Sequence, residues 1–229
     1  MKQYSILLFD LDGVILDFSK AEELSFAKTF ADYGLPLTDE IIRRYQEINH
    51  RRWAEYETGK ITKEECTVGR YEELFSEFHF SADAHAFAKD YMDGLGEGHF
   101  LMPHARDVLE TLAPRYALYV VTNGVSRVAY SRLDGTDSRK YFRDFFVSED
   151  LGAQKPSMEY FNQVFAAIPG FDSEKTLLIG DTLSSDIQGA NNAGIDSCWL
   201  NVTHRQNPDG PKSTYEIDSL EKLLPILGL

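Results

Sequence analysis

The sequence has little cysteine and no long apolar run. Its two cysteines, Cys66 and Cys198, form no CxxC pair, and two thiols in 229 residues exclude a disulfide framework. We expect each to be a small residue of the core, because free cysteine is among the most often buried residue types. No segment approaches the ~18 consecutive apolar residues that cross a membrane. The N-terminal segment has no small-residue cleavage site, so a cytoplasmic location is expected.

The sequence is also poor in positive charge. Its 23 lysine and arginine residues are outnumbered by 37 aspartate and glutamate residues, which gives a formal net charge of −14. A basic surface for a nucleic acid polymer or for an anionic membrane is therefore excluded. The six histidines show no spacing typical of a zinc site. A small phosphorylated metabolite stays possible as a partner, provided that a metal or local cations reverse the field at one site.

What is present begins with a strand and a long helical stretch. The apolar run Tyr4–Phe9 (YSILLF) reads as a buried parallel strand. From Ser19 to about Tyr91 the pattern is helical and contains no convincing strand. Within it, Ser19–Glu22 and Thr62–Glu65 resemble capping boxes that open helices. The glycine-rich segment Gly94–Gly98 then predicts a flexible joint.

Beyond this joint, strand-like and helix-like segments alternate. Such alternation predicts an α/β fold, with a parallel sheet covered by helices on both faces. The helical stretch is then an insertion at the carboxyl end of the first strand, the edge where open α/β sheets bind ligands. We expect a catalytic core of residues 1–16 and 97–229 and a helical cap of residues 17–96. The expected later strands are Tyr116–Thr122, Phe145–Ser148, Thr176–Ile179 and Asp196–Leu200, and the expected helices are Val125–Leu133, Met158–Ala167, Ser185–Ala193 and Ser219–Leu227.

The helical stretch is rich in aromatic residues. At helical spacings we interpret them as the core of a helix bundle rather than as a platform on which a base stacks. Arg51 and Arg52 are interpreted as part of a solvated face. The aromatic residues are Phe26, Phe30, Tyr45, Trp53, Tyr56, Tyr71 and Phe75.

Polar clusters fall where the predicted strands end, or shortly after. They are Asp10–Gly13 (DLDG), Thr122–Gly124 (TNG), Lys155–Pro156 and Gly180–Asp186 (GDTLSSD). Each alone is equally typical of a turn or a helix cap. Because the carboxyl ends of parallel strands meet at one edge of a sheet, the four together favour a site.

This combination suits phosphoryl transfer. Asp10 and Asp181, with a backbone carbonyl near Asp12, form a hard oxygen site of the kind that Mg²⁺ accepts. A metal there would screen the repulsion between a carboxylate and a phosphate dianion. Asp10 would then attack phosphorus and form an aspartyl-phosphate. Asp12 would protonate the leaving oxygen and later deprotonate water. Thr122, Asn123 and Lys155 would cradle the phosphate.

In these four motifs the sequence resembles the haloacid dehalogenase-like hydrolase superfamily. The motifs occur in order as DLDGV, VTNG, the lysine of GAQKP and GDTLSSD, and they span nearly the whole chain. The resemblance implies a Rossmann-like core with an inserted helical cap. It implies Asp10 as the nucleophile, Asp12 as the acid and base, and phosphate binding by Thr122, Asn123 and Lys155. The metal set it implies is Asp10, Asp12, Asp181 and Asp186, with Asp186 supporting Mg²⁺ from behind the direct ligands.

Departures from the family pattern separate the subclasses. Superfamily members that dehalogenate carbon substrates lack an acid at the position of Asp12, which argues against dehalogenation. The sugar-phosphate mutases related to β-phosphoglucomutase carry histidine and threonine where this chain has Glu22 and Phe18. Three further stretches, ILDFSKAE, INHRRWAEYETGKITKEE and FVSEDLGAQKP, look like the pyrimidine 5′-nucleotidase subgroup.

The sequence therefore predicts a Mg²⁺-dependent phosphomonoester hydrolase that acts on a small phosphometabolite, first of all a pyrimidine nucleoside 5′-monophosphate. A phosphosugar phosphatase or a β-phosphoglucomutase-like mutase is the alternative enzyme. A sensor that binds a phosphometabolite without turning it over is the alternative from another class, although every catalytic position holds its expected residue.

Overall fold

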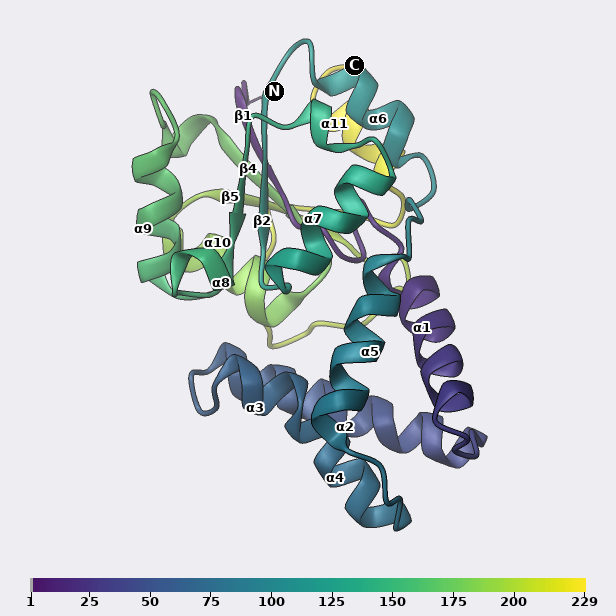
Figure 1. The fold of residues 1–229 in the computed structure, drawn as a ribbon. Coiled ribbons are helices and arrows are strands. Elements are labelled where there is room, and N and C mark those ends of the chain that lie inside the picture. Colours follow the sequence, from purple (N-terminus) through teal and green to yellow (C-terminus); the bar gives the residue numbers. More distant parts are fainter. Residues whose placement is uncertain (1) are drawn as a thin grey trace. The chain divides into compact units, whose positions relative to one another are not determined.

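The computed structural model describes residues 2–229, which divide into two compact units. One unit combines the residues up to Phe18 with His99–Leu229, and we call it the α/β unit. The other is Ser19–Gly98, and we call it the helical unit (Figure 1). That these units act as catalytic core and cap stays a prediction. No helix in the described residues is long and apolar enough to cross a membrane.

The α/β unit is built on one parallel sheet, which confirms the predicted fold class. Its six strands lie in the order β3-β2-β1-β4-β5-β6, and each pairs with its neighbour in parallel. The last strand, β6, was not predicted. The strands are β1 (Ile6–Phe9), β2 (Ala117–Thr122), β3 (Asp144–Val147), β4 (Thr176–Gly180), β5 (Asp196–Leu200) and β6 (Tyr215–Ile217).

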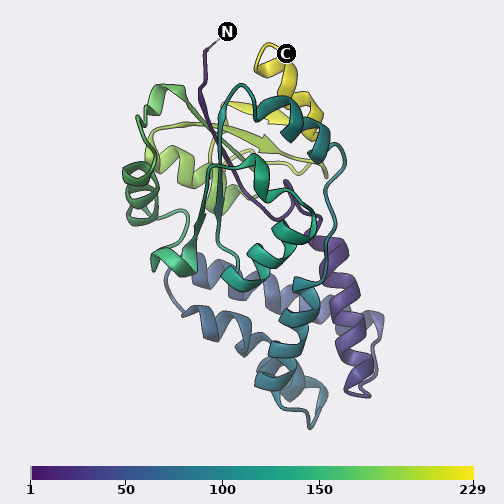
Figure 2. The same cartoon turned by 45° about the horizontal axis from the view of Figure 1, so that its top comes forward.

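Helices cover both faces of this sheet (Figures 1 and 2). Alternate residues of a strand point to opposite faces, so Leu7 and Phe9 pack in one apolar cluster while Ile6 and Leu8 pack in another. The first cluster takes side chains from α6 (Ala105–Leu112), α7 (Ser126–Gly135) and α11 (Leu223–Ile226). The second takes them from α9 (Met158–Ala167) and α10 (Gln188–Ala193), and the short α8 (Ser148–Leu151) follows β3. The sheet is thus buried on both faces, which explains the apolar runs of its inner strands.

Two of the predicted core helices differ from the observed ones. The helix expected over Ser185–Ala193 begins as a π-turn at Leu183–Ile187 and becomes α10 only at Gln188. The closing helix is shorter than Ser219–Leu227. It consists of a 3₁₀ turn at Leu220–Lys222 and the four residues of α11.

The helical unit contains no strand within Ser19–Gly98, as the sequence predicts. Its helices are α1 (which begins at Phe18 and ends at Asp32), α2 (Asp39–Glu57), α3 (Lys63–Thr67), α4 (Gly69–Phe78) and α5 (Ala84–Gly96). The aromatic residues pack against one another in its interior, so their interpretation as bundle core is confirmed. Trp53 is the one aromatic of the predicted set that is only half-buried. The buried ones are Phe26, Phe30, Tyr45, Tyr56, Tyr71 and Phe75.

The segment Gly94–Gly98 ends where the chain passes from the helical unit to the α/β unit, as a joint should, but α5 continues to Gly96, so most of the segment is helix and not a loop. Close packing against α1 explains these glycines instead. A Cβ on Gly94 would lie 2.6 Å from the Ser25 hydroxyl oxygen, and a Cβ on Gly98 would lie 2.4 Å from the Cβ of Ala21. The glycines let two helices approach each other rather than giving the chain freedom.

Of the two predicted capping boxes, one is confirmed and one is wrong. Thr62 caps α3, and its side chain and that of Glu65 exchange hydrogen bonds with each other's backbone amides. Helix α1 already begins at Phe18, so Ser19 lies inside the helix. Glu22 turns instead toward Tyr45, whose hydroxyl donates to its Oε1 at 3.1 Å.

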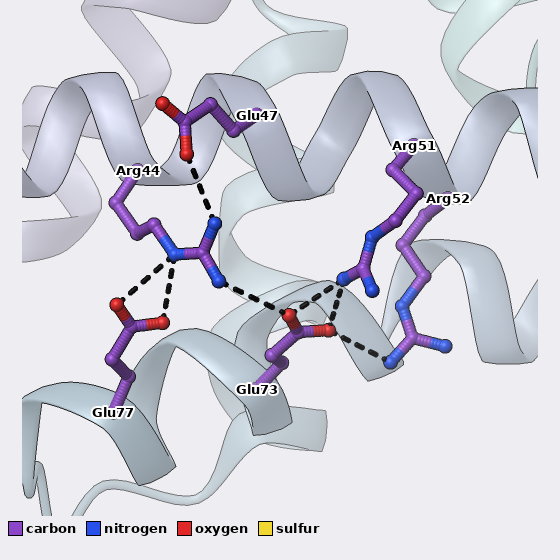
Figure 3. Close-up of polar contacts among 6 residues, drawn as sticks. All are labelled: Arg44, Glu47, Arg51, Arg52, Glu73 and Glu77. Carbon is purple, nitrogen blue, oxygen red and sulfur yellow. Dashed lines mark hydrogen bonds and ion pairs between the residues drawn. The ribbon is translucent and has the colours of Figure 1, made fainter.

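Ion pairs join α2 to α4 (Figure 3). Glu73 of α4 pairs with Arg51 and Arg52 of α2, and the Arg52 pair measures 3.1 Å. Arg44 pairs with Glu77 at 2.7 Å and reaches Glu73 at 3.6 Å. Arg51 and Arg52 therefore bind the neighbouring helix, and the prediction of a merely solvated face is corrected in this respect.

Candidate active site

The predicted catalytic groups follow three strands that lie side by side. Asp10 comes directly after β1, Thr122 ends β2 and Asp181 comes directly after β4. Strand β1 lies between β2 and β4, and all three are parallel. The Asp10 amide donates to the Ile179 carbonyl at 2.8 Å, so the neighbouring strand still holds this residue. The structure therefore brings Asp10, Thr122 and Asp181 to one edge of the sheet.

Three carboxylates meet at this edge. One oxygen of each of Asp10, Asp181 and Asp186 lies within 4.8 Å of the other two. Burial raises the pKa of Asp10 well above its ordinary value; Lys155 lowers it, and the charges of Asp186 and Asp181 raise it. Burial and then the charge of Asp186 raise the pKa of Asp181 to about 6. Buried carboxylate oxygens at this spacing fit a divalent cation such as Mg²⁺, which would relieve their repulsion.

Lys155 is the cation that the structure places among these acids. Its ammonium lies 2.8 Å from Asp10 Oδ1 and 2.6 Å from Asp186 Oδ1, and it donates to the Val121 carbonyl at 2.9 Å. The residue is 2% exposed. Burial by itself would lower the pKa of Lys155, but the charges of Asp10 and Asp186 outweigh it and hold the pKa above its ordinary value. Lys155 is therefore a fixed positive charge at the predicted nucleophile.

Asp186 is held from two sides. One carboxylate oxygen accepts from Lys155, and the other accepts from the Thr182 amide at 3.0 Å. The side chain is fully buried. Its oxygens are thus already engaged, which fits a group that orients Lys155 and the Asp181 loop from behind.

Thr122 and Asn123 organise the turn after β2. The Thr122 hydroxyl oxygen accepts from the Gly124 amide at 3.1 Å, which leaves its own proton to donate. The Asn123 side chain donates to the Lys155 carbonyl and accepts from the Lys155 amide, both at 2.9 Å. Asn123 therefore fixes the backbone of the lysine loop, a contact that the sequence did not predict.

Asp12 lies two residues beyond Asp10, in the turn at Gly13. Gly13 has a φ of +80°, and a Cβ there would lie 2.7 Å from Asp181 Oδ2. Only glycine allows this close approach of the turn to Asp181. The Asp12 carboxylate is 30% exposed and forms an ion pair with Arg132 of α7, whose side chain is 1% exposed.

The amino-acid sequence matches the family model described as haloacid dehalogenase-like hydrolase over residues 7–200. The chain belongs to the haloacid dehalogenase-like hydrolases. It is 44% identical to the HAD-hydrolase YfnB of Bacillus subtilis, over 100% of this chain and 97% of YfnB. The crystal structure of YfnB bound to magnesium superposes on the chain with a TM-score of 0.96 and covers 100% of both chains at 43% identity.

Two further relatives carry a more specific name. Pyrimidine 5′-nucleotidase PynA of Streptococcus pneumoniae is 37% identical over 98% of this chain and 95% of its own length. Pyrimidine 5′-nucleotidase YjjG of Escherichia coli is 30% identical over 96% of each chain. The resemblance to the hydrolase superfamily that the four motifs indicated is thus confirmed, and the chain is similar to the nucleotidase subgroup along its whole length.

Sequence reasoning missed three residues at the site of this haloacid dehalogenase-like hydrolase. Arg132 pairs with Asp12, and the Trp199 indole and the Arg205 guanidinium both donate to the Asp181 carbonyl, the indole at 3.0 Å.

One feature of the sequence could have indicated Arg132. It stands four residues after Val128 and three after Ala129, on the buried face of α7. An arginine in such a stripe of apolar positions is unusual. No sequence pattern indicated Trp199 or Arg205, because they reach the site from β5 and the loop after it.

Proposed function

We propose that this hydrolase is a Mg²⁺-dependent phosphatase of small phosphate monoesters, first of all of pyrimidine nucleoside 5′-monophosphates. The observation that carries the proposal is the buried Asp10 carboxylate, which is paired with Lys155 at 2.8 Å and clustered with Asp181 and Asp186. A carboxylate nucleophile needs neighbouring positive charge to approach a phosphate dianion, and this site supplies one lysine and ligands for a metal.

In the proposed reaction, Asp10 attacks phosphorus and the bond from phosphorus to the nucleoside oxygen breaks. Asp12 donates a proton to that oxygen, and an aspartyl-phosphate forms on Asp10. Water then attacks the same phosphorus while Asp12 accepts a proton from it. The bond between phosphorus and the Asp10 oxygen breaks, and inorganic phosphate leaves. The site returns to its starting protonation state, as a complete cycle requires.

The remaining site residues would bind the metal and the phosphate and would keep the lysine loop in position. Asp10 and Asp181, with the Asp12 backbone carbonyl, would ligate Mg²⁺, and Asp186 would support it. When bound, the metal would neutralise charge on the transferring group. Lys155 offsets part of the effect of burial on the pKa of Asp10 and so favours the ionised form of the proposed nucleophile. The Thr122 hydroxyl would donate to a phosphate oxygen, and Asn123 would hold the lysine loop in place.

The substrate class rests on the names of two relatives, PynA and YjjG. A phosphosugar phosphatase is the second candidate, since it would use the same site. The mutase is less well supported, because Glu22 and Phe18 replace the histidine and threonine expected of it. A cytoplasmic location belongs to the same proposal.

The test is release of inorganic phosphate in the presence of Mg²⁺ across UMP, dUMP, dTMP, purine nucleotides, hexose phosphates and phosphoglycolate. We expect selective turnover of pyrimidine monophosphates that Asp10→Asn abolishes. Asp107→Asn, which changes an exposed aspartate of α6, is the matched control and should keep full activity. Preference for sugar phosphates would replace the substrate class but keep the mechanism. Binding without turnover of any ester would leave the sensor as the better description.

A further inference from the structure

Arg132 occupies a position in α7 where an apolar residue is expected. The neighbouring buried residues of this helix face are Val128, Ala129 and Leu133. The Arg132 side chain is almost completely buried, and its guanidinium carbon lies 5.8 Å from the centre of the Phe18 ring. Its Nη1 donates to Oδ1 of Asp12. Arg132 therefore places a positive charge in the interior of the α/β unit, in contact with Asp12, the predicted acid and base.

Stability does not account for this arginine. Removing a guanidinium from water carries a large desolvation penalty, and the attraction to the partly exposed Asp12 carboxylate offsets only part of it. Buried ion pairs replaced by well-packed apolar residues are often equally stable or more stable. A leucine or methionine at position 132 would continue the apolar face of α7. The arginine is therefore better explained by what it does to Asp12.

The two oxygens of Asp12 have different surroundings. Oδ1 is held by Arg132, whereas Oδ2 faces the turn after β2. A Cβ built on Gly124 would lie 3.8 Å from Asp12 Oδ2 and 3.3 Å from the Thr122 hydroxyl oxygen. Oδ2 of Asp12 therefore lies near Gly124, in the same turn as Thr122, one of the residues proposed to cradle the phosphate.

We propose that Arg132 is a positioning residue that binds Oδ1 of Asp12 and so presents Oδ2 as the oxygen that transfers the proton. This inference rests on the proposed function, in which Asp12 is the acid and base. The proton leaves Oδ2 for the oxygen of the departing nucleoside, and a proton from water returns to Oδ2 in the second step. Arginine carries only donors and keeps its protons throughout, so it orients Asp12 without taking part in the transfer.

The test is a double-mutant cycle between Arg132→Gln and Asp12→Asn, with Mg²⁺ and UMP or the best substrate of the panel. General acid and base groups contribute ~10²–10⁴-fold, and we expect Arg132→Gln to lower kcat by about 10- to 100-fold as part of that. KM should change by less than about twofold, because Arg132 does not bind the phosphate. The double variant should be no slower than Asp12→Asn alone, since both changes remove the same function.

Arg132→Lys covers the case in which the glutamine variant does not fold. Lysine keeps the buried charge but offers a point contact in place of the planar fork, so kcat should again fall while the thermal transition stays close to that of the parent. Arg139→Gln, at an exposed arginine that pairs with Asp134, is the matched control and should leave kcat unchanged.

Four outcomes distinguish a failure of the positioning role from a failure of the proposed mechanism. A wild-type kcat in folded Arg132→Gln or in Arg132→Lys overturns the positioning role, and so does a double variant whose losses multiply. A loss expressed only in KM does the same, because it would make Arg132 a substrate-binding group. A fully active Asp12→Asn, by contrast, refutes the acid–base role itself and with it the proposed mechanism.

Discussion

At the scale of single residues, the carboxylates of the candidate site outnumber its ammonium groups. Three buried or half-buried carboxylates surround one ammonium group, that of Lys155. Burial first, and then the charges of the neighbouring carboxylates, raise the pKa values of Asp10 and Asp181. A divalent cation bound as proposed would therefore compete with protons for the same oxygens.

This competition makes the effect of Mg²⁺ on stability depend on pH. The pKa of Asp181 is raised to about 6 in the folded protein, so without metal the carboxyl is protonated below that pH and ionised above it. Ionisation of Asp181 without metal costs stability as the pH rises through this range, because the folded state binds the proton more tightly than the unfolded chain does. Mg²⁺ would bind the ionised form. We expect the rise in Tm that saturating Mg²⁺ produces to be large at about pH 7.5 and much smaller at about pH 5.

The measurement is a thermal unfolding series with and without Mg²⁺ over this pH range. A ligand at 100 times its Kd adds about 2.7 kcal/mol to the stability of the folded state, which is well within reach of such a series. Asp181→Asn should remove the Mg²⁺-induced rise at every pH, whereas Asp107→Asn should retain it. A rise in Tm of equal size at both ends of the range would speak against a metal site at Asp181.

At the scale of elements, the sequence predicted the inner strands of the sheet well. It did not predict the edge strand β6 or contacts between distant residues such as that of Arg132. Strands β1 (ILLF), β2 (ALYVVT) and β4 (TLLIG) consist largely of consecutive apolar residues, a pattern typical of a sheet buried on both faces. Their polar ends therefore located Asp10, Thr122 and Asp181 in space. Strand β6 has three residues and one of them is exposed, so it lacks that pattern. Residues such as Arg132 were missed because their role depends on a partner 120 residues away.

The same limit explains the error at Gly94–Gly98. Glycine is typical both of a joint and of two helices in close contact, and the sequence of one helix does not reveal the other. Only the structure shows Ser25 and Ala21 of α1 against Gly94 and Gly98.

The ion pairs between α2 and α4 give a prediction at this scale. Glu73 meets Arg44, Arg51 and Arg52 and is 25% exposed, so its replacement by glutamine leaves three arginines near one another without their shared partner. Exposed single pairs contribute about 0–1 kcal/mol, and we expect Glu73→Gln to cost about 1 kcal/mol because several pairs are lost together. Urea unfolding at low and at high salt measures this.

The loss should shrink at high salt, because salt screens partly exposed charges. Asp32→Asn is the matched control. It breaks only the pair with Lys28, in which both side chains are more than half exposed. It should therefore change the free energy of unfolding by less than about 0.5 kcal/mol. A Glu73→Gln variant as stable as the control at both salt concentrations would show that the network is not cooperative.

At the scale of the whole molecule, the α/β unit is formed by two separate stretches of chain. Its two apolar clusters draw every buried member from residues 4–16 and 105–223, and none from the helical unit. The two stretches meet where the helical unit is inserted. The Asp17 amide donates to the Phe100 carbonyl at 2.9 Å, and Leu16 forms an antiparallel bridge with Leu101. The points at which the helical unit leaves and rejoins the α/β unit are therefore adjacent.

We expect the α/β unit to fold when Ser19–Gly98 is replaced by a short Gly/Ser linker. Closing a loop between adjacent ends costs little entropy. The carboxylates proposed to bind the metal and Lys155 all lie within the retained residues. The shortened chain should therefore show one cooperative thermal transition whose Tm still rises with Mg²⁺, measured by circular dichroism. The shortened chain carrying Asp181→Asn should unfold cooperatively but give no such rise. A shortened chain without a cooperative transition would mean that the α/β unit depends on the helical unit for its stability, and that the two are not separable domains.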